Sequence, residues 1–140
     1  MSNTAYGKHY KYVCEGVSTS ALRSPERFGV FLQNLCTSIG MRALAEPQIF
    51  EVAERVELLG DPQEDEGGVS GLLALSTSHI AAHGWPLRGL LIVDVFSCRE
   101  FDPQAAALVI LQLFGLCAIC GTDFSSSMEC AEGVEGPIKL

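Results

Sequence analysis

The sequence predicts an α+β fold, a two-layer α/β sandwich in which an antiparallel sheet carries its helices on one face. Two observations support this fold. Strand-like segments with a two-residue period occur in runs and do not alternate strictly with helices. Two other segments carry strong helix-start signals, one before and one after the central run of strands. The expected order is β-α-β-β-β-α-β within one domain, residues 1–140.

The first strand is expected over residues 6–15, because Tyr10, Tyr12 and Cys14 fall on alternate positions. The clearest strand is GLLIVDVFSC, residues 89–98, which is rich in β-branched side chains. Its apolar content indicates that the second face of the sheet is also covered, which a second copy of the chain could do. The other strands are expected within residues 42–59, with an interruption at Pro47, and within residues 69–77, 78–83 and 116–124.

Capping residues mark both helices. Residues 24–26 (Ser-Pro-Glu) place a capping serine, a proline at the first helical position and an acid in the first turn. Apolar residues then recur at helical spacing as far as Gly40, and glycine commonly follows the end of a helix. Residues 102–103 (Asp-Pro) open the second helix in the same way, and it is expected to run to about Phe114. Residues 84–89 are expected to form a turn.

The charge and composition narrow the class of partner and the compartment. The net charge of −8, from 17 acidic and 9 basic residues, argues against nucleic acid or an anionic membrane as a partner, because both require a basic face. The longest apolar run, residues 105–120, is shorter than the roughly 20 residues of a membrane-spanning helix. The first eleven residues are too polar for a secretory leader, and the six cysteines are then expected to be reduced thiols. We therefore expect a cytoplasmic protein.

The central segment places hydroxyl, imidazole and thiol groups on neighbouring predicted strands. The Ser78 hydroxyl could attack the Thr77 carbonyl and turn the amide into an ester, a reaction that needs an oxyanion donor and a base. An offset of eight residues puts Ser70 on the same face as Ser78 if the strand is unbroken. An antiparallel return of the next strand is expected to bring Cys98 near His83, and a thiol is a suitable proton donor.

Such an ester leads to a cofactor made from the chain itself. Removal of the Ser78 α-proton eliminates the ester and leaves a dehydroalanine, which hydrolyses to a pyruvoyl group. A pyruvoyl carbonyl forms a Schiff base with a substrate amine and accepts electrons as carbon dioxide leaves. Chemistry of this kind would act on a small-molecule amine substrate as the partner, and no metal is expected.

Four motifs between Gly68 and Cys98 carry a family resemblance. Gly-Val-Ser-Gly, Leu-Ser-x-Ser-His-Ile, His-x-Trp-Pro and Asp-Val-Phe-x-Cys follow one another, and an Asp-Pro helix start comes next. This order and spacing resemble the short prokaryotic S-adenosylmethionine decarboxylases, which are self-processing and pyruvoyl-dependent. The resemblance implies decarboxylation of S-adenosylmethionine for polyamine biosynthesis. It also implies self-cleavage between Thr77 and Ser78, which would divide the chain into residues 1–77 and 78–140.

The resemblance further implies a role for each site residue. Ser78 is the pyruvoyl precursor, Ser70 and His83 assist processing, and Cys98 is the catalytic acid. Two processed heterodimers would pair as a homo-oligomer, with the active sites near their interface. His79 belongs to the motif, but no chemistry can be assigned to it from the sequence.

Several positions depart from the family pattern and keep two alternatives open. Thr77 stands where the family usually has Glu, Gly84 and Leu87 change the motif around Trp-Pro, and Arg99 replaces the glycine that follows the catalytic cysteine. One alternative is the same mechanism acting on arginine or ornithine. The other is a non-processing homologue that acts as a binding or regulatory partner, for example of an active paralogue.

Two more features have a predicted structural role only. The loop at residues 60–68 (GDPQEDEGG) is acidic and is expected to be solvated, although its acids could also compensate for carboxylates that the motif lacks. Cys117 and Cys120 have a metal-like spacing, but they lie in an apolar run with no second pair and are expected to pack in the core.

Overall fold

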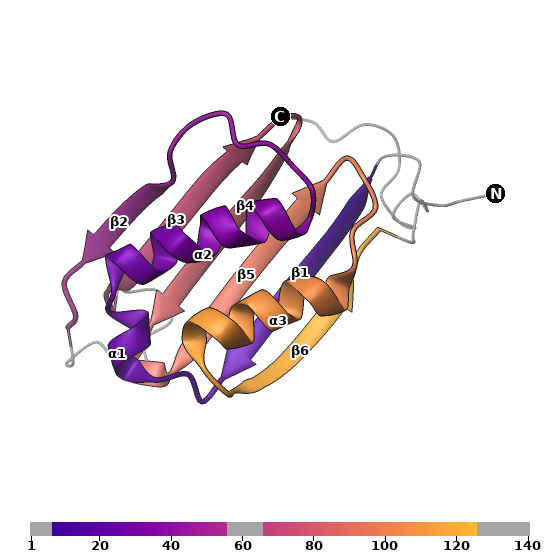
Figure 1. The fold of residues 1–140 in the computed structure, drawn as a ribbon. Helices are drawn as coiled ribbons and strands as arrows, with labels where there is room; N and C mark the ends of the chain where they lie inside the picture. Colours follow the sequence, from indigo (N-terminus) through magenta and orange to yellow (C-terminus); the bar gives the residue numbers. More distant parts are fainter. Residues whose placement is uncertain (1–6, 56–65, 126–140) are drawn as a thin grey trace, which may run out of the picture.

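A computed structural model of the chain describes residues 7–55 and 66–125, which form a six-stranded sheet and three helices (Figure 1). The strands are ordered β2-β3-β4-β5-β1-β6 across the sheet, and every neighbouring pair is antiparallel. The strands are β1 (Lys8–Glu15), β2 (Gln48–Val52), β3 (Gly68–Leu75), β4 (Ser78–Trp85), β5 (Leu90–Ser97) and β6 (Ala118–Asp123). The helices are α1 (Thr19–Leu22), α2 (Pro25–Ser38) and α3 (Pro103–Phe114), with a 3₁₀ turn η2 (Pro86–Arg88). No helix in the two described ranges is long and apolar enough to cross a membrane.

Both long helices lie on the same face of the sheet, so the predicted two-layer α+β sandwich is confirmed (Figure 1). Their starts form as the sequence predicts. The Ser24 side chain accepts a hydrogen bond from the Arg27 N–H at 3.1 Å, and the Asp102 side chain accepts one from the Gln104 N–H at 2.9 Å. Each cap satisfies a backbone donor that the first turn of a helix leaves without a partner.

The structure adds one helix and moves several predicted boundaries. Helix α1, capped by Ser18, was not predicted because four residues are too few to show a helical period. The second strand begins only after Pro47, since proline has no N–H to donate to a neighbouring strand. Strand β4 continues through Trp85, so the turn predicted at residues 84–89 contracts to η2 and Gly89, whose φ of 62° is left-handed.

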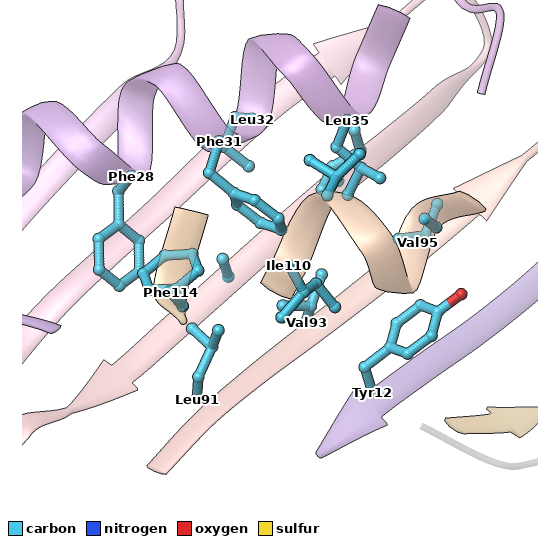
Figure 2. Close-up of a cluster of buried hydrophobic side chains, with 14 of the residues drawn as sticks. Tyr12, Phe28, Phe31, Leu32, Leu35, Leu91, Val93, Val95, Ile110 and Phe114 are labelled. Atoms are coloured by element: carbon cyan, nitrogen blue, oxygen red, sulfur yellow. The ribbon is translucent and has the colours of Figure 1, made fainter. Parts of the chain in front are cut away.

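The hydrophobic core lies between the sheet and helices α2 and α3. Every second residue of the central strands points toward the helices, as Val93 does on β5 and its register partner Ala82 does on β4. On the helical side, the Phe114 ring lies 5.2 Å from the rings of both Phe28 and Phe31, each in an edge-to-face arrangement. Figure 2 shows these rings together between α2 and the sheet. This core covers the helix-side face of the strands that carry the β3–β4 hairpin.

The opposite face of the sheet carries no helix among the described residues, and it exposes apolar side chains. Phe50, Val52 and Leu72 lie on this face of β2 and β3 and are 53%, 45% and 40% exposed. Trp85 and Ile92 lie on the same face of β4 and β5 by strand alternation. Exposed apolar area of this kind is typical of an interaction surface. That a second copy of the chain covers it stays a prediction.

We expect Phe114→Ala to lower the free energy of unfolding by about 3–5 kcal/mol, because it empties the space between Phe28 and Phe31. Leu116→Ala is the matched control, since Leu116 is 91% exposed, and it should change that free energy by less than about 0.5 kcal/mol. Urea unfolding of both variants in a Ser78→Ala background, followed by circular dichroism, measures the difference. Equal losses would contradict this description of the core.

Candidate active site

The β3–β4 hairpin places Ser78 at the first position of β4. Leu75 pairs directly with Ser78, so the turn contains only Ser76 and Thr77. Thr77 has a φ of 67°, and it is the one non-glycine residue with a positive φ in the described part of the chain. A β-branched residue in this conformation is strained, at a cost of about 1–3 kcal/mol. The strain therefore lies in the residue that precedes the predicted cleavage point.

Cys98 meets the hairpin directly. The Cys98 backbone N–H donates a hydrogen bond to Ser78 Oγ at 2.8 Å. Thr77 Oγ1 lies 2.9 Å from Cys98 Sγ and 2.5 Å from the Ser76 carbonyl oxygen, and either atom can accept its one proton. The register of β4 against β5 explains this contact, because His79 pairs with Phe96 and the next steps bring Ser78 and Thr77 to the end of β5. The structure thus joins the predicted processing serine to the predicted acid.

The surroundings of Cys98 favour its thiolate. The thiol is exposed, and its pKa lies below the usual thiol value. The largest cause is a hydrogen bond with the Thr77 side chain, and the next is one with the Ser78 side chain. The positive charge of Arg99 lowers the pKa in the same direction. Arg99, one of the departures from the family motif, therefore acts on the electrostatics of the thiol.

A pocket of about 390 Å³ opens beside the hairpin turn. Thr77 and Cys98 line one part of it, and Met41, Arg42 and Arg99 line another. The two charged side chains among its lining residues are both cationic. The pocket is large enough to admit a small molecule to the Cys98 thiol and to Thr77.

Ser70 and His83 form a second group at a distance from the hairpin. They are register partners on β3 and β4, and Ser70 Oγ lies 2.8 Å from His83 Nδ1. His83 is five residues beyond Ser78 on β4, which corresponds to about 16 Å along the strand. Both side chains lie on the open face of the sheet.

Two expectations about these residues are therefore wrong. Ser70 does not share a face with Ser78, because the two-residue turn interrupts the strand and Ser78 takes the face of its partner Leu75. Cys98 does not lie near His83, because β5 pairs His83 with Ile92 and carries Cys98 to the opposite end of β4. The four predicted site residues form two pairs in one chain, Ser78 with Cys98 and Ser70 with His83.

A third cluster of polar side chains was not predicted from the sequence. Asp94 lies between two imidazoles, with Oδ1 2.7 Å from His9 Nε2 and Oδ2 3.3 Å from His79 Nε2. The three residues come from β1, β5 and β4 and occupy the open face of the sheet. His79 and Asp94 both fall on alternating outward positions, which was a usable signal. The strand order that brings His9 beside them was not visible in the sequence.

The acidic loop lies mostly outside the described residues, at positions 60–65. Glu66, within the described part, is 5% exposed, and Arg88 Nε donates to both of its carboxylate oxygens at 2.9 Å. A solvated role is therefore wrong for Glu66, whose buried charge is neutralised by a guanidinium.

Cys117 and Cys120 have different surroundings. Cys117 packs against the core beside Cys14, whose pKa burial raises to about 12, whereas Cys120 is exposed on β6. Core packing is confirmed for Cys117 and wrong for Cys120, because the two positions face opposite sides of the sheet. Within residues 7–55 and 66–125, no three His, Cys, Asp or Glu side chains are grouped so that they could hold a metal ion.

Comparisons with known proteins agree with this fold. A family model described as S-adenosylmethionine decarboxylase matches residues 8–123. The S-adenosylmethionine decarboxylase proenzyme of Thermomicrobium roseum is 46% identical over 54 residues, which cover 38% of this chain and 47% of that protein. The proenzyme of the same name from Anoxybacillus flavithermus is 40% identical over 73 residues, which cover 52% of this chain and 53% of that protein. The matched segments span about half the length of these two relatives.

A solved structure is similar over nearly the whole chain. The crystal structure of the adenosylmethionine decarboxylase from Aquifex aeolicus superposes with a TM-score of 0.66 and covers 91% of this chain and 96% of that one. The sequence identity is 21%, so this similarity concerns the fold.

We expect the Cys98 thiol of a Ser78→Ala variant, which keeps the chain intact, to be alkylated by iodoacetamide at a lower pH than free cysteine in the same buffer. Thiolate is the reactive form, and the Thr77 hydrogen bond lowers the pKa of the thiol. Adding Thr77→Val removes that hydrogen bond and should move the alkylation profile to higher pH. Peptide mapping by mass spectrometry gives both profiles, with alkylation of the exposed Cys120 as an internal control. An unchanged Cys98 profile would contradict the contact.

Proposed function

The chain belongs to the S-adenosylmethionine decarboxylase family, and on this basis we propose that it is a pyruvoyl-dependent carboxy-lyase that cleaves itself between Thr77 and Ser78. The contact of Cys98 with both residues of that bond carries the proposal, since it places a thiol and a backbone donor at the predicted cleavage point. The products of cleavage are residues 1–77 and 78–140. The proenzyme names of the two relatives support self-processing.

The chemistry of cleavage needs only the chain and water. Ser78 Oγ attacks the Thr77 carbonyl carbon, the C–N bond breaks, and the hydroxyl proton passes to the departing amine of Ser78. A base then removes the Ser78 α-proton, the Thr77 carboxylate leaves, and residue 78 becomes a dehydroalanine. Water replaces the amine as ammonia, which leaves the pyruvoyl group. The Cys98 N–H already holds Ser78 Oγ at 2.8 Å, so this contact positions the nucleophile at the end of the hairpin.

The residues around Ser78 suit the group that this cleavage would leave. When present, a pyruvoyl carbonyl condenses with a substrate amine and withdraws electrons as carbon dioxide departs. Cys98 is placed to return a proton to the substrate carbon, because its thiol is exposed at the pocket that adjoins residue 78. A thiol that must remain reduced for this role supports a cytoplasmic location.

We infer that the substrate is S-adenosylmethionine, and family membership supports this choice. Arginine or ornithine is the second candidate, because Thr77, Leu87 and Arg99 depart from the family pattern. Arg42 and Arg99 line the pocket beside the turn, so the cationic group of any of these substrates is expected to face away from that wall. A non-processing binding partner is the third candidate, and it predicts a chain that stays intact.

The separation of the two site pairs supports a proposal about assembly. Ser78 with Cys98 and Ser70 with His83 lie about five residues apart along β4. Suppose that two sheets stack through their open faces about a two-fold axis that lies between the sheets and parallel to both, passing over β4 near Ala81 at right angles to the strand. Each hairpin would then lie opposite the partner's Ser70–His83 pair. We propose such a homodimer of processed chains, with each active site shared between two copies.

The apolar side chains of the open face support the same assembly, because Phe50, Val52 and Leu72 would be removed from water.

Processing predicts two fragments in denaturing mass spectrometry, 1–77 and 78–140, with the second lighter than a serine-terminated fragment by one ammonia. The Ser78→Ala chain should stay whole, because it lacks the nucleophile. Ser76→Ala, one turn residue away, is the matched control and should be cleaved. A wild-type chain that remains intact after long incubation would favour the non-processing homologue.

Activity is expected from the processed protein and not from Ser78→Ala. Release of labelled carbon dioxide from S-adenosylmethionine, arginine and ornithine, measured side by side, identifies the substrate. We expect S-adenosylmethionine to have the highest kcat/KM and Cys98→Ala to lower it by about 10²-fold or more, because general acid catalysis contributes 10²–10⁴-fold. Higher kcat/KM for a basic amino acid would assign the second candidate instead.

A shared site predicts complementation between two inactive chains. His83→Ala alone should process at least about tenfold more slowly, because processing loses a proton-transfer group. Co-expression with Ser78→Ala should restore cleavage of the His83→Ala chain, since the hairpin of that chain then lies opposite an intact His83 from the partner. A Ser78→Ala, His83→Ala double variant is the control partner and should give no rescue. Equal cleavage with both partners would contradict the shared site.

A further inference from the structure

We propose that conformational strain in the left-handed backbone of Thr77 accelerates self-cleavage. Thr77 is then a positioning residue for the first step. The inference rests on the proposed function and assigns a role to a residue that departs from the family motif. Thr77 has a φ of 67° and a β-branched side chain. Positions with such a φ are ordinarily occupied by glycine or asparagine. Thr77 supplies the carbonyl group of the bond that has to break.

The surrounding backbone enforces the conformation. On the β3 side, the Ser76 N–H donates to the Arg42 carbonyl at 2.9 Å, and the Leu44 N–H donates to the Ala74 carbonyl at 2.9 Å. On the β4 side, Ser78 is fixed by pairing with Leu75. The turn is therefore held from two directions, and Thr77 has no freedom to return to a common conformation while the amide is intact.

The Thr77 side chain is held as well. Its hydroxyl lies 2.9 Å from Cys98 Sγ, while the neighbouring Cys98 N–H donates to Ser78 Oγ at 2.8 Å. Both contacts tie the turn to the end of β5. The Ser78 hydroxyl and the strained residue Thr77 are therefore both held by Cys98.

The first step of cleavage releases this constraint. The Ser78 Oγ–carbonyl carbon bond forms, the amide C–N bond breaks, and the hydroxyl proton moves to the Ser78 nitrogen. The path from the Thr77 carbonyl to the Ser78 Cα then runs through Oγ and Cβ, which is one atom longer than the path through nitrogen. The pairing of β4 then no longer fixes the backbone of Thr77. Because ester formation releases the strain, the strain lowers the barrier to this step.

The test compares three substitutions at one position. Thr77→Gly adopts a positive φ without strain and should slow cleavage about tenfold. Thr77→Asn, which tolerates this conformation, should fall between Thr77→Gly and the wild type. Thr77→Val keeps the β-branch and loses the hydroxyl contact with Cys98, so it should be cleaved faster than Thr77→Gly. Freshly purified chains are followed by denaturing mass spectrometry, with hydroxylamine added to a second sample to trap the ester.

Two controls separate strain from damage to the fold. Ser76→Gly places the same flexible residue at the other turn position, where φ is not positive, and should leave the rate within about threefold of the wild type. In a Ser78→Ala background, Thr77→Gly should unfold at a urea concentration no lower than the parent, because removing strain does not weaken the fold. If Thr77→Gly only damaged the fold, it would lower both the cleavage rate and the urea concentration at the midpoint of unfolding.

The outcomes are distinct. A wild-type chain that never cleaves removes the proposed function and this inference with it. A wild-type chain that cleaves while Thr77→Gly cleaves equally fast overturns the inference and leaves the proposed function standing. Equal slowing of Thr77→Val and Thr77→Gly also overturns it, because the hydroxyl contact with Cys98 would then carry the effect.

Discussion

The antiparallel register of β4 against β3 and β5 is the constraint on which the site depends. Pairing of Leu75 with Ser78 leaves a turn of two residues, and pairing of His79 with Phe96 brings the end of β5 to that turn. A slip of one residue would turn Ser78 to the opposite face and separate it from Cys98. The core that α2 and α3 form behind the sheet resists such a slip, because it fixes which face of each strand is buried.

The same register divides the reactive side chains between two places. Ser78 and Cys98 occupy the hairpin end, while Ser70 and His83 form a hydrogen-bonded pair farther along the strands. The same open face exposes apolar side chains at Phe50 on β2 and Leu72 on β3. A single chain therefore contains both pairs of reactive side chains but keeps them apart. The proposed dimer would bring one pair from each chain together, in addition to burying apolar side chains.

Local signals in the sequence predicted the fold and both long helices, because capping by Ser24 and Asp102 and strand alternation involve near neighbours. The errors came from quantities that depend on register. The prediction that Ser70 and Ser78 share a face required an unbroken strand, and the turn at Thr77 breaks the strand and reverses the parity. The partner of Glu66 could not be predicted either, since Arg88 is 22 residues away and is brought close only by the folded sheet.

The central claim is that residue 78 becomes an electrophile at the end of the hairpin. Reductive trapping tests it most directly: the purified protein is incubated with S-adenosylmethionine and cyanoborohydride, and the modified residue is located by fragment mass spectrometry. The account predicts a substrate adduct on the first residue of the fragment 78–140, and none on Ser78→Ala. Decarboxylation of substrate without an adduct at residue 78, or with the adduct on a lysine, would contradict it.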